Sequence, residues 1–266
     1  MPELDLADAT LHFEIDGTGP PLMLIAGMAS DSASWAPLVP LLRDHYTLIR
    51  PDNRSTGRTR PWDAPVSVPI YARDCAALLH HLGTGPAHVL GHSMGGMIGM
   101  QLAQMAPERV ATLTLAASAP LRLSRNIALF QTLVEIRKSD APPDTWLRAF
   151  FPWLFASSVY DVPGAVDDAA AAALAYPHAQ SVEAMAHQLA ALDGFDPAGL
   201  LPRCPTQALL ANDDLLVPPA LAQTVLRDTP TTVVANAGHS IHWDAPGAVA
   251  LHLRRFTDDH PIEGAQ

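Results

Sequence analysis

Residues 91–96 read Gly-His-Ser-Met-Gly-Gly and hold a serine in a setting that could make its hydroxyl a nucleophile. The apolar run 87–90 predicts a buried strand before them, and the run 97–105 predicts a helix after them. A Gly-x-Ser-x-Gly motif between a strand and a helix is typical of a sharp turn that exposes the serine hydroxyl. The two flanking glycines supply the small side chains that such crowding requires. We therefore predict that Ser93 is a nucleophile and that the protein catalyses hydrolysis.

A serine hydroxyl is a weak nucleophile at neutral pH, so it needs a histidine base and an acid that orients this base. His239 lies on a glycine-containing loop after a late predicted strand and is the candidate base. The loop 212–218 offers two acids, of which we favour Asp214; Asp213 is interpreted as a loop-capping residue, and the reversed roles are the alternative. His92 is adjacent to Ser93, and neighbouring side chains diverge on a tight turn. We interpret His92 as structural or pocket-lining.

Hydrolysis of an acyl group also requires donors for the oxyanion that forms on the carbonyl oxygen. The amide of Met94 would lie at the N-terminus of the predicted helix, where the helix dipole favours negative charge. The second donor is predicted to be the amide of Met28, on the loop after a buried strand, where Gly27 would let the backbone approach a substrate. An ordinary turn at Gly27 is the alternative interpretation.

Predicted strands and helices alternate along most of the chain, which indicates a mainly parallel sheet with helices on both faces. The opening is hairpin-like and indicates an antiparallel start to the sheet. Strands are expected at 11–15, 22–26, 46–50, 87–90, 112–117, 206–211 and 231–235, and helices at 37–43, 69–82, 219–227 and 245–256 and after Ser93.

The alternation breaks between 120 and 201, where helical periodicity is present but no strand is indicated. We predict a core domain formed by residues 1–119 and 202–266, and an inserted helical cap, or lid, at 120–201. The cap is rich in aromatic residues that could line an apolar substrate pocket or form ordinary core. The pocket candidates are Trp146, Phe150 and Trp153.

The formal net charge is −11, from 27 acidic and 16 basic residues, so nucleic acid is not an expected partner. No apolar run reaches the roughly 18 residues of a membrane span, and the N-terminus is acidic where a signal peptide would be basic. We expect a cytoplasmic monomer or homodimer without membrane contact.

The two cysteines, Cys75 and Cys204, are far apart and outside any metal-ligand pattern, so we expect buried, inert thiols and no metal site.

The chain resembles the α/β-hydrolase superfamily over essentially its whole length. The resemblance rests on the oxyanion loop 27–28, the turn 52–59, the nucleophile elbow 91–95, and the segments that hold Asp214 and His239. It implies the α/β-hydrolase fold, with a mainly parallel eight-stranded sheet, helices on both faces and a helical cap. It also implies Ser-dependent hydrolysis.

Details of these motifs refine the assignment. The family's acid loop reads G-x-x-D-x-x-x-P, and alignment on Pro218 puts Asp214 in the acid position, with Ala211 in place of the glycine. Ala26 stands where many relatives have histidine, and Ser55 where glycine is usual. These departures concern whether a side chain assists in binding the oxyanion at this loop, and they leave the backbone amide donors unaffected.

Within the superfamily the chain looks similar to small bacterial carboxylesterases and to 3-oxoadipate enol-lactonases. The elbow carries serine and not aspartate, which disfavours the dehalogenase and epoxide hydrolase chemistries. We therefore expect a small-molecule ester or lactone as substrate, and the mechanism requires no metal or cofactor. The alternatives are hydrolysis of a carbon–carbon bond in a β-diketone or ring-fission product, and a slow-turnover ligand sensor. A carboxylate-bearing substrate would favour a cap arginine, and Arg125, Arg137 and Arg148 are available.

Overall fold

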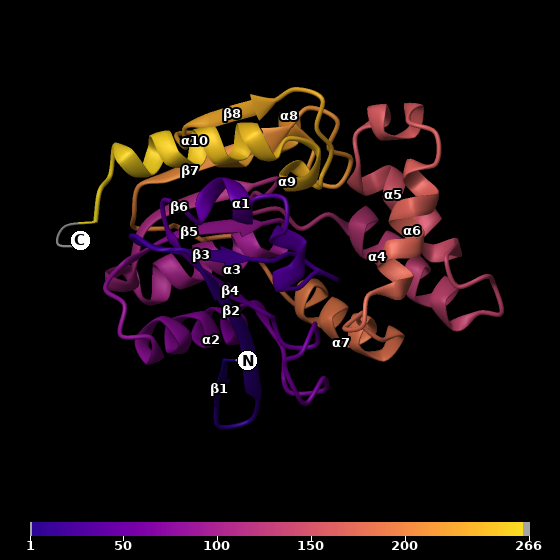
Figure 1. The fold of residues 1–266 in the computed structure, drawn as a ribbon, viewed down its shortest axis with the longest axis horizontal. Helices are drawn as coiled ribbons and strands as arrows, with labels where there is room; N and C mark the ends of the chain where they lie inside the picture. The colour runs from indigo at the N-terminus through magenta and orange to yellow at the C-terminus, as the bar shows by residue number, and fades with distance from the viewer. Residues whose placement is uncertain (1, 263–266) are drawn as a thin grey trace.

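A computed structural model describes residues 2–262 and contains an eight-stranded sheet with helices on both faces (Figure 1). The strand order is β1-β2-β4-β3-β5-β6-β7-β8. The first two strands are antiparallel to their neighbours and the others are parallel, as expected from the sequence. The strands are β1 (Glu3–Asp5), β2 (Thr10–Asp16), β3 (Pro21–Ile25), β4 (Thr47–Pro51), β5 (Ala87–His92), β6 (Val110–Ala116), β7 (Thr206–Ala211) and β8 (Thr231–Val234).

Helices cover both faces because the central parallel strands are apolar on both sides. Every residue of β5 is buried, as is typical of a strand inside a parallel sheet. One apolar cluster contains α2 and α3, and a second cluster on the opposite face contains α1 and α10 (Figure 1). The core helices are α1 (Val39–Leu42), α2 (Val68–His81), α3 (Met94–Met105), α8 (Pro219–Leu226), α9 (Ile241–Asp244) and α10 (Pro246–Asp258), with short 3-10 turns η1 (Ser32–Trp35) and η2 (Pro107–Arg109).

The chain between β6 and β7 forms helices and no strand in the described residues. These helices lie together to one side of the sheet (Figure 1). They are α4 (Ser124–Lys138), α5 (Thr145–Leu154), the 3-10 turn η3 (Ser157–Asp161), α6 (Ala165–Ala175) and α7 (Val182–Asp193). Helix α4 packs against both α5 and α7. The helical character of this insertion matches the sequence-based expectation, while its boundaries as a separate cap domain stay a prediction.

The start of the sheet differs from the hairpin that the sequence suggested. Strand β2 is antiparallel, but its partner is β4, with Phe13 opposite Pro51, and not β3. The turn after β2 contains Gly17 at φ +81°, and a side chain there would collide with the backbone of Arg43. The turn therefore packs against the segment before β4, which places β4 between β2 and β3. The short edge strand β1 had no recognisable sequence signal.

No helix among residues 2–262 combines the length and the apolar character needed to cross a membrane.

Candidate active site

Ser93 lies between β5 and α3 with φ +53° and ψ −120°, a conformation that is costly for a residue with a side chain. Close packing holds the turn in place. A side chain at Gly91 would overlap the backbone of Gly95, and one at Gly95 would overlap the carbonyl oxygen of Ile25. The Ser93 carbonyl also accepts a hydrogen bond from Ser118 Oγ at 2.6 Å. Glycine is therefore required on both sides of Ser93, as the motif predicted.

Three side chains distant in sequence form one chain of hydrogen bonds. His239 Nε2 lies 2.8 Å from Ser93 Oγ, and His239 Nδ1 lies 2.9 Å from Asp214 Oδ2 and 3.1 Å from Oδ1. The Asp214 side chain is fully buried and that of His239 is 4% exposed. Donation from Nδ1–H to the carboxylate leaves Nε2 free to accept the serine proton. This arrangement can deprotonate Ser93 and stabilise the imidazolium that results.

The loop after β7 distinguishes its two aspartates. Asp214 Oδ1 also accepts the backbone N–H groups of Leu216 and Val217, each at 2.8 Å. Asp213 is exposed, and its own N–H donates to the carbonyl of Ala237. Asp214, and not Asp213, therefore both caps this loop and contacts His239. The sequence-based interpretation of Asp213 as the capping side chain is not what the hydrogen bonds show.

Two further histidines lie behind His239 and are held neutral. His92 is buried, and its burial lowers its pKa to about 3. Burial also lowers the pKa of His242 well below the ordinary value. The ring centroids of His92 and His242 are 4.4 Å apart, and both rings contact Trp35. His92 does not line the pocket described below, so its position is that of a structural residue.

The loop after β3 approaches the serine closely. A side chain on Gly27 would lie 3.0 Å from His92 Nδ1 and 3.1 Å from Ser93 Cβ, so glycine gives the room for this approach. Met28 follows it and lines the same pocket as Ser93. Met94 is the first residue of α3, where the amide has no acceptor within the helix. Both predicted oxyanion donors therefore belong to backbone segments beside Ser93.

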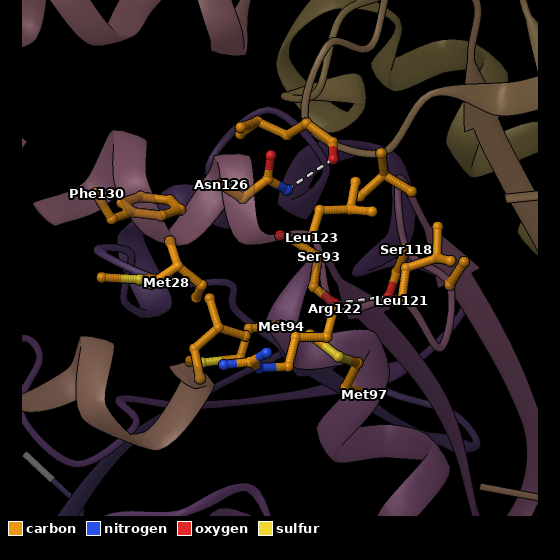
Figure 2. Close-up of a pocket in the computed structure, with 15 residues that line it drawn as sticks. Met28, Ser93, Met94, Met97, Ser118, Leu121, Arg122, Leu123, Asn126 and Phe130 are labelled. Atoms are coloured by element: carbon orange, nitrogen blue, oxygen red, sulfur yellow. Dashed lines mark hydrogen bonds between the residues drawn. The ribbon is translucent and has the colours of Figure 1, made fainter. Parts of the chain in front are cut away.

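The pocket above Ser93 is small and mostly apolar, with a cavity volume of about 50 Å³ (Figure 2). Its polar groups include Arg122, which pairs with Asp193 at 2.6 Å, and Asn126, which donates to the carbonyl of Leu216 at 2.8 Å. The other lining residues are Met28, Ser93, Met94, Met97, Ser118, Ala119, Leu121, Leu123, Ile127, Phe130, Leu192, Leu216 and Val217.

The aromatic residues predicted for this pocket lie elsewhere. Trp146, Phe150 and Trp153 are not among the described residues that line it. Phe150 is buried behind the lining and packs against Phe130, with ring centroids 5.4 Å apart, and the Trp146 ring lies 4.5 Å from the Arg137 guanidinium. They pack within the helical insertion because its helices must bury their own apolar faces.

The cap arginines named from the sequence are also absent from the lining in the described part of the chain. Arg125 donates to the carbonyl of Leu215, Arg137 stacks on an aromatic ring, and Arg148 pairs with acidic side chains. Arg122 lines the pocket instead. Its place just after the last strand before the insertion was the available signal.

Sequence reasoning also missed a contact between the His239 loop and the helical insertion. Asp244 Oδ2 accepts the N–H groups of Gly238 at 2.8 Å and of Ala156 at 2.9 Å. Ser240 N–H donates to the carbonyl of Leu154 at 2.7 Å. A side chain at Gly238 would collide with this backbone. The insertion therefore supports the loop that carries His239, and no local pattern announces such a long-range contact.

Among residues 2–262, no three histidine, cysteine, aspartate or glutamate side chains are grouped in a way that could hold a metal ion.

The fold and the site together define a known class. The model of the alpha/beta hydrolase family matches residues 22–251, and the chain belongs to this family. A relative from Azorhizobium caulinodans, named "Putative carbamate hydrolase RutD", is 31% identical over 247 residues that cover 91% of each chain. A similar relative from Agrobacterium fabrum bears the same name and is 28% identical over 78% of this chain and 82% of its own.

Solved structures show the same architecture. A thermophilic esterase from Thermogutta terrifontis, with malate bound, superimposes with a TM-score of 0.80 at 25% identity over 95% of each chain. The enol-lactonase from Burkholderia xenovorans LB400 has a TM-score of 0.83 at 21% identity, and covers 97% of this chain and 100% of its own. The second likeness concerns the fold alone. The chain is thus a hydrolase of this fold.

Proposed function

We propose that this hydrolase cleaves small carboxylic esters or lactones through an acyl-enzyme intermediate on Ser93. The observation that carries the proposal is the hydrogen-bonded chain from Ser93 Oγ through His239 to Asp214, with distances of 2.8 and 2.9 Å. Asp214 fixes the tautomer of His239 and stabilises its protonated form. The backbone amides of Met28 and Met94 are proposed to hold the oxyanion.

The reaction then proceeds in two stages, acylation of Ser93 and hydrolysis of the acyl-enzyme. Ser93 Oγ attacks the carbonyl carbon while its proton passes to His239 Nε2, and the tetrahedral intermediate places its negative oxygen at the two amides. Collapse breaks the bond to the leaving alkoxide, which takes the proton from His239. Water next gives a proton to His239 and attacks the acyl-enzyme. Release of the acid returns that proton to Ser93.

The experiment compares wild type and Ser93→Ala on p-nitrophenyl acetate and on an enol-lactone. We expect loss of turnover on the order of 10⁴-fold or more, since removal of a triad nucleophile usually has this effect. A fluorophosphonate probe should label wild type at Ser93, as read by mass spectrometry, and should not label the variant. Unchanged turnover by folded Ser93→Ala would overturn the proposal.

Carbamate hydrolysis is a second candidate, because two relatives that cover most of this chain carry that name. A carbamate also presents a carbonyl carbon that Ser93 can attack, with nitrogen in place of the α-carbon of an ester's acyl group. An aryl carbamate therefore belongs in the same panel as its acetate counterpart. A β-diketone belongs there also, because ester silence with Ser93-dependent diketone cleavage would favour the carbon–carbon hydrolase alternative.

A further inference from the structure

The helical insertion contacts the loop after β3 through one fully buried side chain. Gln188, on α7, is 0% exposed, and its Oε1 accepts the backbone N–H of Ala29 at 2.8 Å. The same oxygen accepts Gln180 Nε2 at 3.1 Å, and Gln180 Nε2 also donates to the carbonyl of Ser55 at 2.7 Å. The Gln188 side chain is therefore fixed from two sides where it meets the loop.

The Ala29 amide needs such a partner because of its backbone conformation. Ala29 has φ +58°, in the left-handed region that is unfavourable for a residue with a side chain. The peptide between Met28 and Ala29 therefore does not hold its orientation through local preference alone. Its N–H points at Gln188, and this contact fixes the position of Met28, whose own amide is one peptide earlier.

We propose that Gln188 is a positioning residue that holds the oxyanion loop from the helical insertion. The inference rests on the proposed function, because it assigns a purpose to the placement of the Met28 amide. Gln188 does not touch the reacting atoms in this assignment. It acts through Ala29, and it sets where the Met28 N–H lies relative to Ser93.

Helix α7 also lines the proposed substrate pocket, so the helix that contacts the oxyanion loop through Gln188 is also in contact with the substrate. Leu192 lines the pocket and lies four residues after Gln188, so the two side chains share one face of the helix. A substrate packed against Leu192 therefore presses on the same helix that holds the oxyanion loop. The lining of the pocket and the placement of the Met28 amide are mechanically connected through one turn of α7.

The test compares Gln188→Met, Gln188→Glu and a control variant, His187→Leu, with wild type on p-nitrophenyl acetate. Gln188→Met keeps the side-chain length and removes the oxygen acceptor, and we expect kcat to fall at least tenfold with KM changed less than threefold, because misplaced oxyanion donors weaken transition-state binding. Gln188→Glu keeps an acceptor for both N–H groups and should recover kcat to within about threefold of wild type. Affinity for a boronic acid that forms a tetrahedral adduct with Ser93 should fall in Gln188→Met in parallel with kcat/KM.

His187→Leu is the matched control. His187 Nδ1 lies 2.9 Å from Ser55 Oγ, so this variant removes a neighbouring contact between α7 and the core without touching Ala29. It should keep kcat and boronate affinity within about twofold of wild type. If Gln188→Met does not fold, Gln180→Met replaces it, since it removes the donor that fixes Gln188 Oε1, and a loss of kcat above threefold is then expected.

The results separate this inference from the proposed function. A dead Ser93→Ala together with wild-type kcat in Gln188→Met would overturn the role of Gln188 and leave the serine mechanism in place. Equal losses in Gln188→Met and His187→Leu, or in Gln188→Met and Gln188→Glu, would also overturn it. Full turnover by Ser93→Ala would instead remove the serine mechanism on which it rests.

Discussion

The imidazole of His92 donates a hydrogen bond from Nε2–H to the backbone carbonyl of His239, at 2.8 Å. The two rings also contact each other, with centroids 4.9 Å apart. His92 ends β5 directly before Ser93, so this bond ties the loop of the proposed base to the turn of the proposed nucleophile. Because Nε2 donates, the other ring nitrogen carries no proton in the neutral form. The pair thus fixes the relative position of two loops that come from different parts of the chain.

This arrangement predicts acid sensitivity. In the unfolded chain His92 would bind a proton below about pH 6.5, whereas burial keeps it neutral in the native state down to about pH 3. The unfolded state therefore binds more protons in this window, and the free energy of unfolding falls as the pH falls below 6.5, by up to about 1.4 kcal/mol per pH unit for one group. The contribution is fully present above pH 6.5.

His92→Gln should reduce this slope, because glutamine can still donate to the His239 carbonyl and takes no proton. Urea unfolding at several pH values between 7.5 and 4.5 measures it for wild type, His92→Gln and His45→Gln, the last at an exposed position. An equal slope in wild type and His92→Gln would contradict the prediction.

The two neighbouring aspartates should differ sharply in their effect on catalysis. Asp214→Asn removes the charge that stabilises protonated His239 and disturbs the tautomer, so kcat should fall on the order of 10⁴-fold. Asp213→Asn leaves the His239 contacts intact and should change kcat less than about threefold. Steady-state kinetics on p-nitrophenyl acetate, with circular dichroism to check folding, gives the ranking. The reverse order would show that Asp213 is the acid.

The size of the cavity predicts a preference for short acyl chains. The cavity volume is only about 50 Å³ and the lining is mostly apolar, so we expect a short acyl chain to fit and longer chains to require the lining to open. On p-nitrophenyl esters from acetate to decanoate, we expect kcat/KM to peak at four carbons or fewer and to fall at least tenfold by decanoate.

Phe130→Ala removes a large lining side chain, and it should move the preferred ester toward longer chains. A flat profile, or one that rises to decanoate in wild type, would mean that the cavity does not receive the acyl group.

Two glycines of α3 provide a matched pair for the packing argument. A Cβ on Gly95 would overlap the backbone oxygen of Ile25, which cannot move without displacing β3. A Cβ on Gly99 would lie 2.8 Å from the end of the Leu113 side chain, which can rotate away. Gly95→Ala should therefore destabilise the fold by about 3 kcal/mol or more and abolish activity.

Gly99→Ala should cost about 1 kcal/mol or less, because the gain in helix propensity offsets the crowding. Thermal unfolding of both variants measures the difference. Equal melting temperatures of Gly95→Ala and Gly99→Ala would contradict the prediction, because they would show that the turn has room for a side chain beside β3.

Local sequence patterns were sufficient to predict those parts of the site whose structure depends only on neighbouring residues. The elbow around Ser93 needs glycine on both sides, and the loop with Asp214 ends in a proline that fixes its register, so both could be recognised without a structure. The order of acid and histidine along the chain then singled out His239. In the structure, His239 lies within hydrogen-bonding distance of both Ser93 and Asp214.

Patterns that depend on distant partners were not readable in the same way. The turn after β2 suggested a hairpin, but β4 pairs with β2, because pairing is chosen by contacts across the sheet and not by the turn alone. The aromatic residues of the insertion gave no sign of which face each would occupy. Phe130 reaches the pocket, and Phe150 packs behind it.

The sequence by itself determined the α/β class and the identity of the candidate nucleophile, base and acid, because steric needs within a few residues leave short, recognisable motifs. Only the tertiary structure decided the neighbours of these groups. Gln188 contacts Ala29, and Asp244 contacts Ala156 of the insertion, in both cases between positions far apart in the sequence, and side chains from several elements line the pocket. Such contacts are set by the packing of whole helices against the sheet, and that packing has no counterpart in any single stretch of the chain.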